Sequence, residues 1–369
     1  MKILLVGEYS TFHKNLRDGL RKKGYIVDLA SGKDGWKQLD YADIELYTER
    51  NNEGIIGIYK NVLSSYANYK ILRGYDIIQF INPMIYFPVF NVDLISRILK
   101  LNKGSLVSLV SVGADYALLK AYRNGEFEYY IEDYESLSPY SARFPRSLFY
   151  IYSDKFLLNK CDVIIPGAYE YSVGYKGNPK VVNPIPMPID TDNFKYEQNV
   201  VNSKIIFFHG INREKAKGTR FIREALYKIQ KEFPEDVDVI IDGHMPYSKY
   251  VEFLKKANVV IDQCSCYGYG MNALIAMSMG KVVVAGARKE MLDAYGIENS
   301  PVIHAQPSVD QLVDAFRFII KNKNKISEWG KKSREYVERF HDCKVIADKY
   351  MNIWKEKYSM FKSKSIDNV

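Results

Sequence analysis

Residues 257–285 read ANVVIDQCSCYGYGMNALIAMSMGKVVVA. The stretch contains, in order, an apolar run, a glycine turn, a helical pattern and a second apolar run: Val259–Asp262, Gly268-x-Gly270, Asn272–Met279 and Val282–Ala285. This succession predicts a β-α-β unit of a parallel sheet. The glycines allow the backbone to approach a ligand closely, and the first turn of the helix offers free N–H groups to anionic oxygen atoms.

The same alternation extends through the second half of the chain. Upstream we expect a strand, a helix, a strand and a helix over Ile205–Phe208, Gly218–Phe233, Val237–Ile241 and Tyr247–Lys256. Downstream, long helical patterns cover Val309–Lys321 and Ile326–Phe361. Alternating strands and helices of this kind predict a parallel sheet covered on both faces.

The first half repeats the pattern independently. Apolar runs over Lys2–Val6, Tyr25–Ala30, Ile77–Ile81, Leu106–Val112 and Val163–Pro166 alternate with helical patterns. Between the two halves, Pro184, Pro186 and Pro188 exclude a helix or a central strand and predict an extended linker. We therefore expect two doubly wound α/β domains, which bind ligands at the carboxyl ends of their strands.

Composition agrees with two globular domains. The chain has 369 residues, of which 47% are hydrophobic and 26% charged, and its four cysteines are scattered. Disorder, a disulfide scaffold and a zinc site are disfavoured, and a reducing compartment is favoured. No signal peptide is expected at MKILLVGEYS, and no apolar run approaches the ~18 residues of a membrane span. We expect a cytoplasmic protein.

Most of the net charge of +8 lies near the C-terminus, where residues 321–369 hold 13 Lys and Arg against 7 Asp and Glu. One interpretation is a solvated helix face. The other is a surface that holds the protein at the inner face of a membrane containing anionic lipid. No nucleic-acid partner is expected, because no aromatic and basic motif accompanies the charge.

A second segment suited to anion binding is Phe207–Thr219, FFHGINREKAKGT. A strand runs into a basic loop and then into a helix that begins near Gly218. Helix N–H groups beside Arg213, Lys215 and Lys217 suit a diphosphate, although an ordinary loop with solvated lysines has the same pattern. The P-loop spacing GxxxxGK[ST] is absent, so ATP hydrolysis is not supported.

Together these segments resemble the retaining GT-B glycosyltransferases of group 1 (family 4). The resemblance also includes the turn at Gly7, the linker PMPIDTDNF at residues 186–194 and the closing helices. It implies two Rossmann-like domains facing a central cleft, with the last helix crossing back to the first domain. The expected domains are residues 1–185 together with 345–369, on the acceptor side, and residues 195–344, on the nucleotide-sugar side.

The resemblance implies a set of site residues. Lys217 would be the phosphate lysine, Arg213 would replace an arginine that the family has beside Gly210, and Asp115 would be a polar group near the reacting centre. The predicted donor-binding positions are Gly7, Gly210, Lys217, Gly268, Tyr269, Gly270, Met271, Asn272 and Leu274. His13 and Tyr267 are predicted donor or acceptor contacts, with a surface or capping role as the alternative for His13.

Three positions depart from the family pattern. The paired glutamates that hold the donor sugar and ribose are replaced by Tyr267 and Ile275, and a histidine of the first domain is replaced by Val112. An isoleucine accepts no hydrogen bond, and a tyrosine lacks the two oxygens of a carboxylate. The acidic, Tyr-rich stretch around Glu132, Asp133 and Glu135 is interpreted as an acceptor-side loop, with a solvated loop as the alternative.

The leading hypothesis is a transferase that moves a sugar from a UDP- or GDP-sugar to a saccharide or lipid-linked saccharide in cell-surface polysaccharide synthesis. By resemblance it would be retaining, with no bound cofactor and no metal. The alternative from another class is a catalytically silent GT-B module that binds a nucleotide sugar or glycan. A UDP-sugar epimerase is less favoured because it depends on the missing carboxylates. A dehydrogenase is disfavoured because GxGxxG does not follow the first strand.

Overall fold

The computed structural model describes residues 1–32, 41–46, 71–85, 88–141, 146–243 and 245–366. The chain divides into two compact units. Unit 1 comprises Met1–Lys120, Ser138–Pro188 and Cys343–Val369, and unit 2 comprises Ala121–Leu137 and Ile189–Asp342. The boundary at Pro188 and Ile189 follows the proline-rich linker. The expected domains differ from these units mainly at residues 121–137, which were expected in the first domain and are grouped with unit 2.

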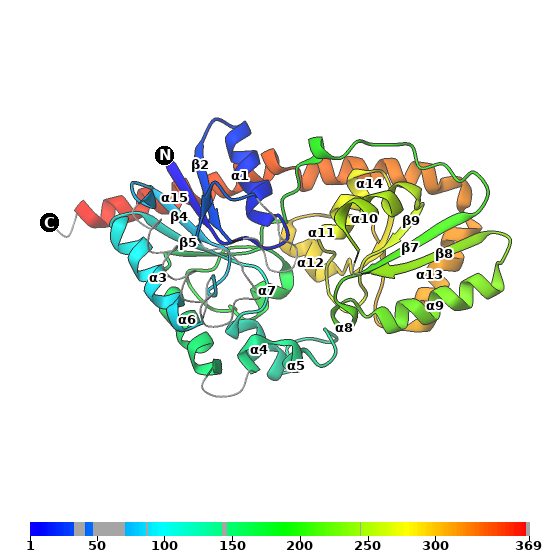
Figure 1. Ribbon diagram of the computed structural model, residues 1–369, viewed down its shortest axis with the longest axis horizontal. Coiled ribbons are helices and arrows are strands. Elements are labelled where there is room, and N and C mark those ends of the chain that lie inside the picture. Colours follow the sequence, from blue (N-terminus) through cyan, green and yellow to red (C-terminus); the bar gives the residue numbers. More distant parts are fainter. Residues whose placement is uncertain (33–40, 47–70, 86–87, 142–145, 244, 367–369) are drawn as a thin grey trace. The chain divides into compact units, whose positions relative to one another are not determined.

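Unit 1 is built on a parallel sheet with the order β3-β2-β1-β4-β5-β6. Its strands are β1 (Lys2–Val6), β2 (Ile26–Ser31), β3 (Ile44–Glu45), β4 (Ile77–Phe80), β5 (Leu106–Ser111) and β6 (Val163–Pro166). Its helices include α1 (Phe12–Lys22), α3 (Pro88–Leu101), α4 (Tyr116–Arg123), α6 (Arg146–Lys160), α7 (Tyr169–Val173) and α15 (Cys343–Ile366). This is the strand order of a dinucleotide-binding doubly wound fold, which reverses between β1 and β4. Figure 1 labels β2, β4 and β5 of this sheet together with several of its helices.

Unit 2 contains a second parallel sheet with the order β11-β10-β9-β7-β8. Its strands are β7 (Ile205–Ile211), β8 (Val237–Gly243), β9 (Val259–Ile261), β10 (Val282–Ala285) and β11 (Ile303–His304). Its helices are α5 (Tyr134–Leu137), α8 (Glu214–Lys217), α9 (Thr219–Glu232), α10 (Tyr247–Lys256), α11 (Met271–Ser278), α12 (Lys289–Tyr295), α13 (Val309–Lys321) and α14 (Ile326–Phe340). The order reverses between β7 and β9, so unit 2 is also doubly wound.

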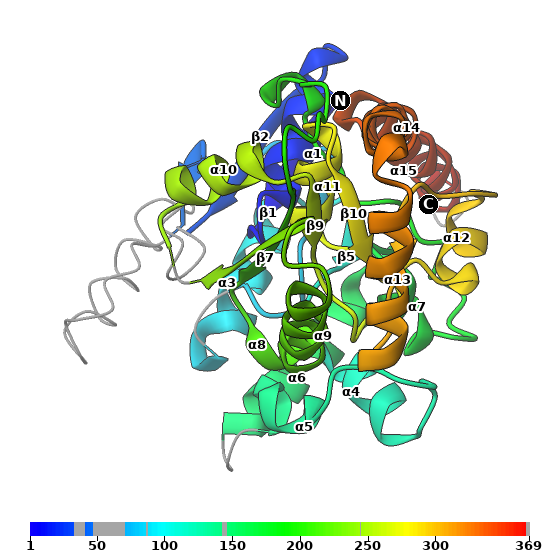
Figure 2. The same cartoon turned by 90° about the vertical axis from the view of Figure 1, so that its right-hand side faces the viewer.

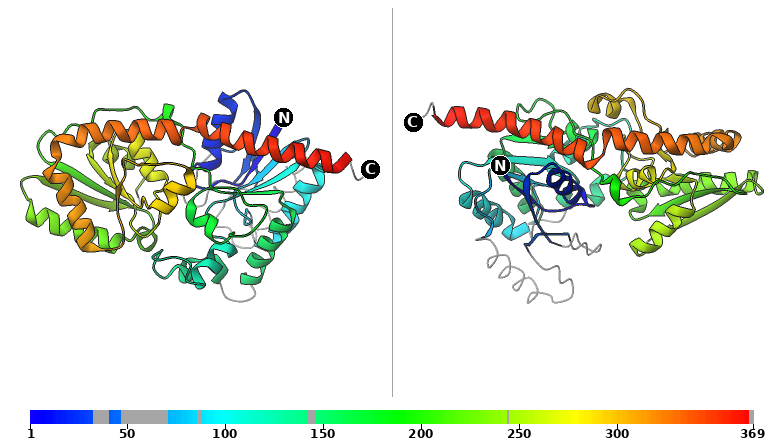
Figure 3. Two further views of the ribbon diagram at one scale, coloured as in Figure 1. Left: turned by 180° about the vertical axis from the view of Figure 1, so that it is seen from behind. Right: turned by 90° about the horizontal axis from the view of Figure 1, so that it is seen from above.

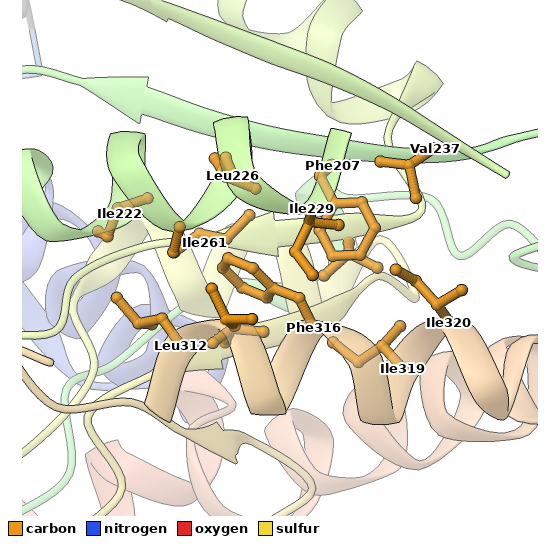
Figure 4. Close-up of a cluster of buried hydrophobic side chains, with 14 of the residues drawn as sticks. Phe207, Ile222, Leu226, Ile229, Val237, Ile261, Leu312, Phe316, Ile319 and Ile320 are labelled. Carbon is orange, nitrogen blue, oxygen red and sulfur yellow. The ribbon is translucent and has the colours of Figure 1, made fainter. Parts of the chain in front are cut away.

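The core of unit 2 lies between its sheet and the helix pair α9 and α13, which lie side by side (Figure 2). Figure 4 shows Phe207 of β7 and Phe316 of α13 pointing toward each other, and their rings meet edge-on with centroids 5.4 Å apart. Both side chains are fully buried. Helix α13 begins where predicted, because Ser308 caps it by accepting a hydrogen bond from the Gln311 N–H.

Helix α15 belongs to unit 1, where it packs beside α1 (Figure 3). Trp354 is fully buried and donates its indole N–H to Ser108 Oγ of β5 at 3.1 Å. The single helical pattern predicted over residues 326–361 is in fact two helices, because His341 and Asp342 form a break. At that break the His341 carbonyl accepts the Ile189 N–H at 2.9 Å, a bond outside the helical pattern. Among the described helices, none is long and apolar enough to cross a membrane.

Candidate functional site

The point in unit 2 where the strand order reverses lies between β7 and β9. Loops that leave adjacent strands in opposite directions at such a point form a crevice at the carboxyl end of the sheet. Here the two loops are residues 212–218, which follow β7, and residues 262–270, which follow β9. Both segments that the sequence selected for anion binding therefore occupy the same edge of the same sheet.

A buried ion pair joins these two loops. Lys217 Nζ lies 2.7 Å from Asp262 Oδ1, and the two side chains are 5% and 2% exposed. The other oxygen, Asp262 Oδ2, accepts the Gly270 N–H at 2.9 Å. Burial by itself would raise the pKa of Asp262, but the Lys217 charge and these hydrogen bonds hold it below the usual value. In this structure Lys217 fixes the geometry of both loops.

Gly218 permits the close contact between the loops. Its φ of +70° lies in the left-handed region, and a Cβ there would come within 2.5 Å of both Cys264 Sγ and Ser265 Oγ. Any other side chain would separate the two loops. Gly210 is also closely packed, since an added Cβ would lie 2.8 Å from the Tyr250 ring.

His209 forms a second buried cross-link at this edge. Its Nδ1 lies 2.9 Å from the Ile261 carbonyl and its Nε2 lies 2.9 Å from Thr219 Oγ1. Burial and the nearby Lys217 charge lower the pKa of His209 to about 4. The imidazole is therefore neutral near pH 7 and connects β7, β9 and the start of α9.

The groups left available to a ligand lie on the loop after β7. The Arg213 side chain is exposed and makes no hydrogen bond or ion pair within the described residues. Next to it, Asn212 Oδ1 is buried without a hydrogen-bond partner among those residues. A buried acceptor without a partner requires a physical explanation, and a bound donor group supplies one. Together with the N-terminal turns of α9 and α11, these groups suit an anion that also carries hydroxyl or N–H donors.

The residues of the glycine turn and of the start of α11 differ in how far they are exposed. Gly270 precedes α11, whose first residues Met271 and Asn272 are partly exposed. Leu274 is fully buried in unit 2. The Tyr269 side chain is also buried, and its hydroxyl lies 2.7 Å from the Tyr336 hydroxyl and 2.9 Å from His341 Nε2. Only the backbone of Gly268–Gly270 and the first residues of α11 remain as predicted ligand contacts.

Tyr267 is covered by the segment that precedes α5. Only 3% of it is exposed. The ring of Tyr129 stacks on it with centroids 5.6 Å apart, and Phe127 meets it edge-on at 5.9 Å. The Glu128 N–H donates to its hydroxyl at 2.7 Å. Arg288, which the sequence analysis missed, completes this cluster with its guanidinium 4.8 Å from the Tyr267 ring centroid.

In unit 1 the predicted residues Gly7 and His13 contact each other. Gly7 adopts a φ of +84°, where a Cβ would lie 2.5 Å from Ile81, and its carbonyl lies 2.7 Å from His13 Nδ1. His13 Nε2 lies 3.2 Å from the Gln79 amide nitrogen. Burial lowers the pKa of His13 to about 3 despite the Gly7 bond, so the ring is neutral. It holds the turn after β1 in place, which differs from the surface or capping role weighed as an alternative.

Asp115 is fully buried at the carboxyl end of β5. It accepts hydrogen bonds from Ser111 Oγ at 2.7 Å, the Tyr175 hydroxyl at 2.8 Å and the Leu118 N–H at 2.8 Å. These contacts make it an N-terminal cap of α4. Burial raises its pKa although all of these bonds favour the carboxylate. These three partners lie within unit 1, and a role of Asp115 near the reacting centre stays a prediction.

Asp262 is the other important residue that sequence reasoning overlooked. The signal was present, because a carboxylate directly after a fully apolar strand needs a partner when the strand is buried. Arg288, by contrast, follows β10 in a stretch without any recognisable motif. Within the ranges that the structure describes, no three His, Cys, Asp or Glu side chains are grouped so that they could hold a metal ion.

Comparisons with known proteins agree with this geometry. Residues 199–336 match the family described as Glycosyl transferases group 1. No curated protein sequence matches the chain. Sucrose-phosphate synthase from Thermosynechococcus elongatus is similar in structure, with a TM-score of 0.62 and 14% identity over 98% of this chain and 100% of that one.

Two further structures are similar over nearly all of the chain. Anabaena HepE in complex with UDP and glucose has a TM-score of 0.59 and 12% identity, covering 96% of this chain and 99% of that one. UDP-GlcNAc 2-epimerase from Neisseria meningitidis has a TM-score of 0.53 and 12% identity, covering 97% and 100%. The predicted fold is confirmed: the chain has the two-domain GT-B fold, and residues 199–336, within unit 2, are similar to the glycosyl transferases group 1 family.

Proposed function

We propose that the protein is a glycosyltransferase that takes a sugar from a nucleotide-sugar donor, a UDP- or GDP-sugar, and transfers it to a saccharide or lipid-linked saccharide. The observation that carries the proposal is the junction of the loops after β7 and β9. There the Lys217–Asp262 pair and the Gly270 N–H hold two helix starts together beside Arg213, which has no partner among the described residues. HepE, which shares the fold, was solved with UDP-glucose.

The chemistry follows from charge. Departure of the nucleoside diphosphate places negative charge on its terminal phosphate, and cations and N–H groups already in place stabilise that charge in the transition state. Arg213 is exposed and unpaired among the described residues, so we assign it the direct phosphate contact. Lys217 is paired with Asp262 and acts by fixing the loop. Retention of configuration, catalysis without a bound metal and a role in polysaccharide synthesis belong to the same proposal.

A specific observation favours the alternative of a binding module without catalysis. Tyr267 and Ile275 stand where the resemblance places the two donor carboxylates, and Tyr267 is buried beneath Phe127 and Tyr129. Asp115 is engaged in capping α4. Neither Tyr267 nor Ile275 brings a carboxylate to the donor sugar.

A screen against UDP-, GDP- and TDP-sugars distinguishes the glycosyltransferase from the binding module without catalysis. Binding is measured by calorimetry, and nucleotide release is measured with and without saccharide acceptors. We expect Arg213→Gln to weaken donor binding about tenfold or more, as for the loss of a charge-assisted hydrogen bond. Arg223→Gln is the matched control, because Arg223 is a nearby cation already paired with Glu214 at 2.9 Å. Binding without turnover for any donor and acceptor favours the silent module, and absence of any binding refutes both.

We also propose that the basic C-terminal segment holds the protein near anionic lipid. Deleting residues 345–369 is unsuitable as a test, because it removes the buried Tyr350 and Trp354. Lys362→Gln/Lys364→Gln removes two charges from the last turns of α15 and leaves Tyr350 and Trp354 in the sequence. We expect this variant to lose sedimentation with phosphatidylserine vesicles at low salt. Unchanged sedimentation would contradict the membrane role.

A further inference from the structure

Residues 126–133, which we call the acidic strap, lie in sequence between two parts of unit 1 but pack within unit 2. Aromatic residues of the strap pack against Tyr267, whereas its acidic residues are exposed. Phe127 and Tyr129 contact the Tyr267 ring, while Glu128, Glu132 and Asp133 are exposed. It contains no Lys or Arg, so its charge is wholly negative.

Each of these three carboxylates meets a cation at the carboxyl edge of the second sheet. Asp133 Oδ2 lies 2.9 Å from Lys215 Nζ in α8, and Glu132 pairs with Arg220 in the first turn of α9. Glu128 Oε2 lies 2.5 Å from Arg288, which follows β10. The strap therefore pairs with one cation in the loop that we assign to phosphate, Lys215, and with two cations in neighbouring segments, Arg220 and Arg288.

The ion pairs that Glu132 and Asp133 make are exposed, so another anion can replace these carboxylates. Their carboxylates are each 54% exposed, and their cations are 59% and 64% exposed. Exposed pairs of this kind are weak and screened by salt. The other end of the strap is held more firmly, because the Glu128 N–H bonds to the buried Tyr267 hydroxyl. A bound anion would therefore displace the end of the strap that contains Glu132 and Asp133, while the end at Glu128 stays in place.

We propose that the acidic strap is an internal competitor for the anion site of unit 2. Its Glu132 and Asp133 carboxylates occupy Lys215 and Arg220 in the ligand-free protein, and a diphosphate must displace them to use the same cations. The inference rests on the proposed function in taking that diphosphate to be part of a nucleotide sugar. It adds a device that sets the affinity for the donor and couples its binding to movement of the strap.

The test compares two double variants that remove the same charge. Glu132→Gln/Asp133→Asn neutralises the competing carboxylates, and Asn tolerates the left-handed φ of +54° at position 133. Glu126→Gln/Glu135→Gln is the control, because Glu126 bonds to Asn124 and Glu135 pairs with Arg123, both in the adjoining part of the same segment. Affinity for UDP and for inorganic pyrophosphate is measured by calorimetry at low salt, and amide exchange of residues 126–133 is measured with and without pyrophosphate.

We expect the first variant to bind both anions about five- to tenfold more tightly than wild type, with the control within about twofold. In the wild type, pyrophosphate should increase amide exchange at residues 131–133. Equal affinities of the two variants, weaker binding by the first, or added protection of the strap on binding would each overturn the proposal. So would the absence of pyrophosphate binding in every variant.

The strap and the proposed function can fail separately. If pyrophosphate shows the strap effect but no nucleotide sugar binds, the strap stands and the proposed donor is wrong. If a nucleotide sugar is bound and turned over but the two variants behave alike, the enzyme stands and the strap is not a competitor.

Discussion

Replacing Lys217 with Met tests whether the buried ion pair holds the site together. Methionine keeps a long unbranched side chain but leaves the Asp262 carboxylate, which is 2% exposed, without its cation. Removing one partner of a buried pair costs about 3–5 kcal/mol in the free energy of unfolding. We expect the lower end, about 3 kcal/mol, because the Gly270 N–H still bonds to Asp262. For a unit of this size that corresponds to a fall of roughly 6–12 °C in Tm.

The loss should depend on pH in a defined direction. In the wild type the pKa of Asp262 is lower in the folded state than in the unfolded state, so its contribution is present above the unfolded pKa and is lost as pH falls below it. Without Lys217, burial dominates and raises the folded pKa. The carboxylate then favours unfolding as pH rises, so the defect of Lys217→Met should be largest near neutral pH and smaller at about pH 5.

Urea unfolding followed by far-UV circular dichroism at pH 7.5 and 5.0 measures these effects. The double variant Lys217→Met/Asp262→Asn removes both charges and keeps an acceptor for the Gly270 N–H, so it should be more stable than Lys217→Met at pH 7.5. A cost below about 1 kcal/mol, which is typical of exposed pairs, would refute the argument. So would a defect that is the same at both pH values.

Three further predictions concern packing and titration. Gly218→Ala should destabilise by about 1–3 kcal/mol more than Gly296→Ala in urea unfolding, because both have positive φ but only the Cβ at 218 meets other atoms within 4 Å. Trp354→Ala should cost about 3–5 kcal/mol, whereas Met360→Ala on the exposed side of the same helix should stay within about 0.5 kcal/mol. His13 has its pKa lowered to about 3, so wild-type stability should fall as pH drops below about 6.5, and His13→Gln should flatten this loss in unfolding measured between pH 7.5 and 5.

Local patterns were sufficient to predict most of the fold. Helices α10 and α13 and strand β10 have the predicted bounds, because their apolar periodicity, glycines and caps all indicate the same element. The break at His341 and Asp342 could not be predicted from periodicity. It depends on bonds to Ile189 and Tyr269, which lie far from it in sequence.

The sequence was sufficient to select the segments of the candidate site, but it did not indicate the role of each side chain in them. A polar residue at the end of a strand can face a ligand or cap the following helix, and its sequence position is the same in both cases. Asp115 caps α4, whereas Asp262 pairs with Lys217 and caps the glycine turn. Lys217 and its partner Asp262 are 45 residues apart in sequence, and Tyr267 and Glu128 are 139 residues apart. No local sequence pattern can predict contacts between residues so far apart.

Net charge is a poor guide to this site, and the structure gives the physical reason. The excess of +8 lies mainly in the C-terminal segment, while cations around the loop after β7 have acidic partners: Lys217 has Asp262, Lys215 has Asp133 and Arg220 has Glu132. Arg213 is the exception, since it has no partner among the described residues. On our proposal an incoming anion meets Arg213 directly and reaches the other exposed cations by exchanging with carboxylates already present. Affinity then depends on how readily each carboxylate leaves. The exposed pairs with the strap can open, and the buried pair at Lys217 stays closed and preserves the shape of the loop.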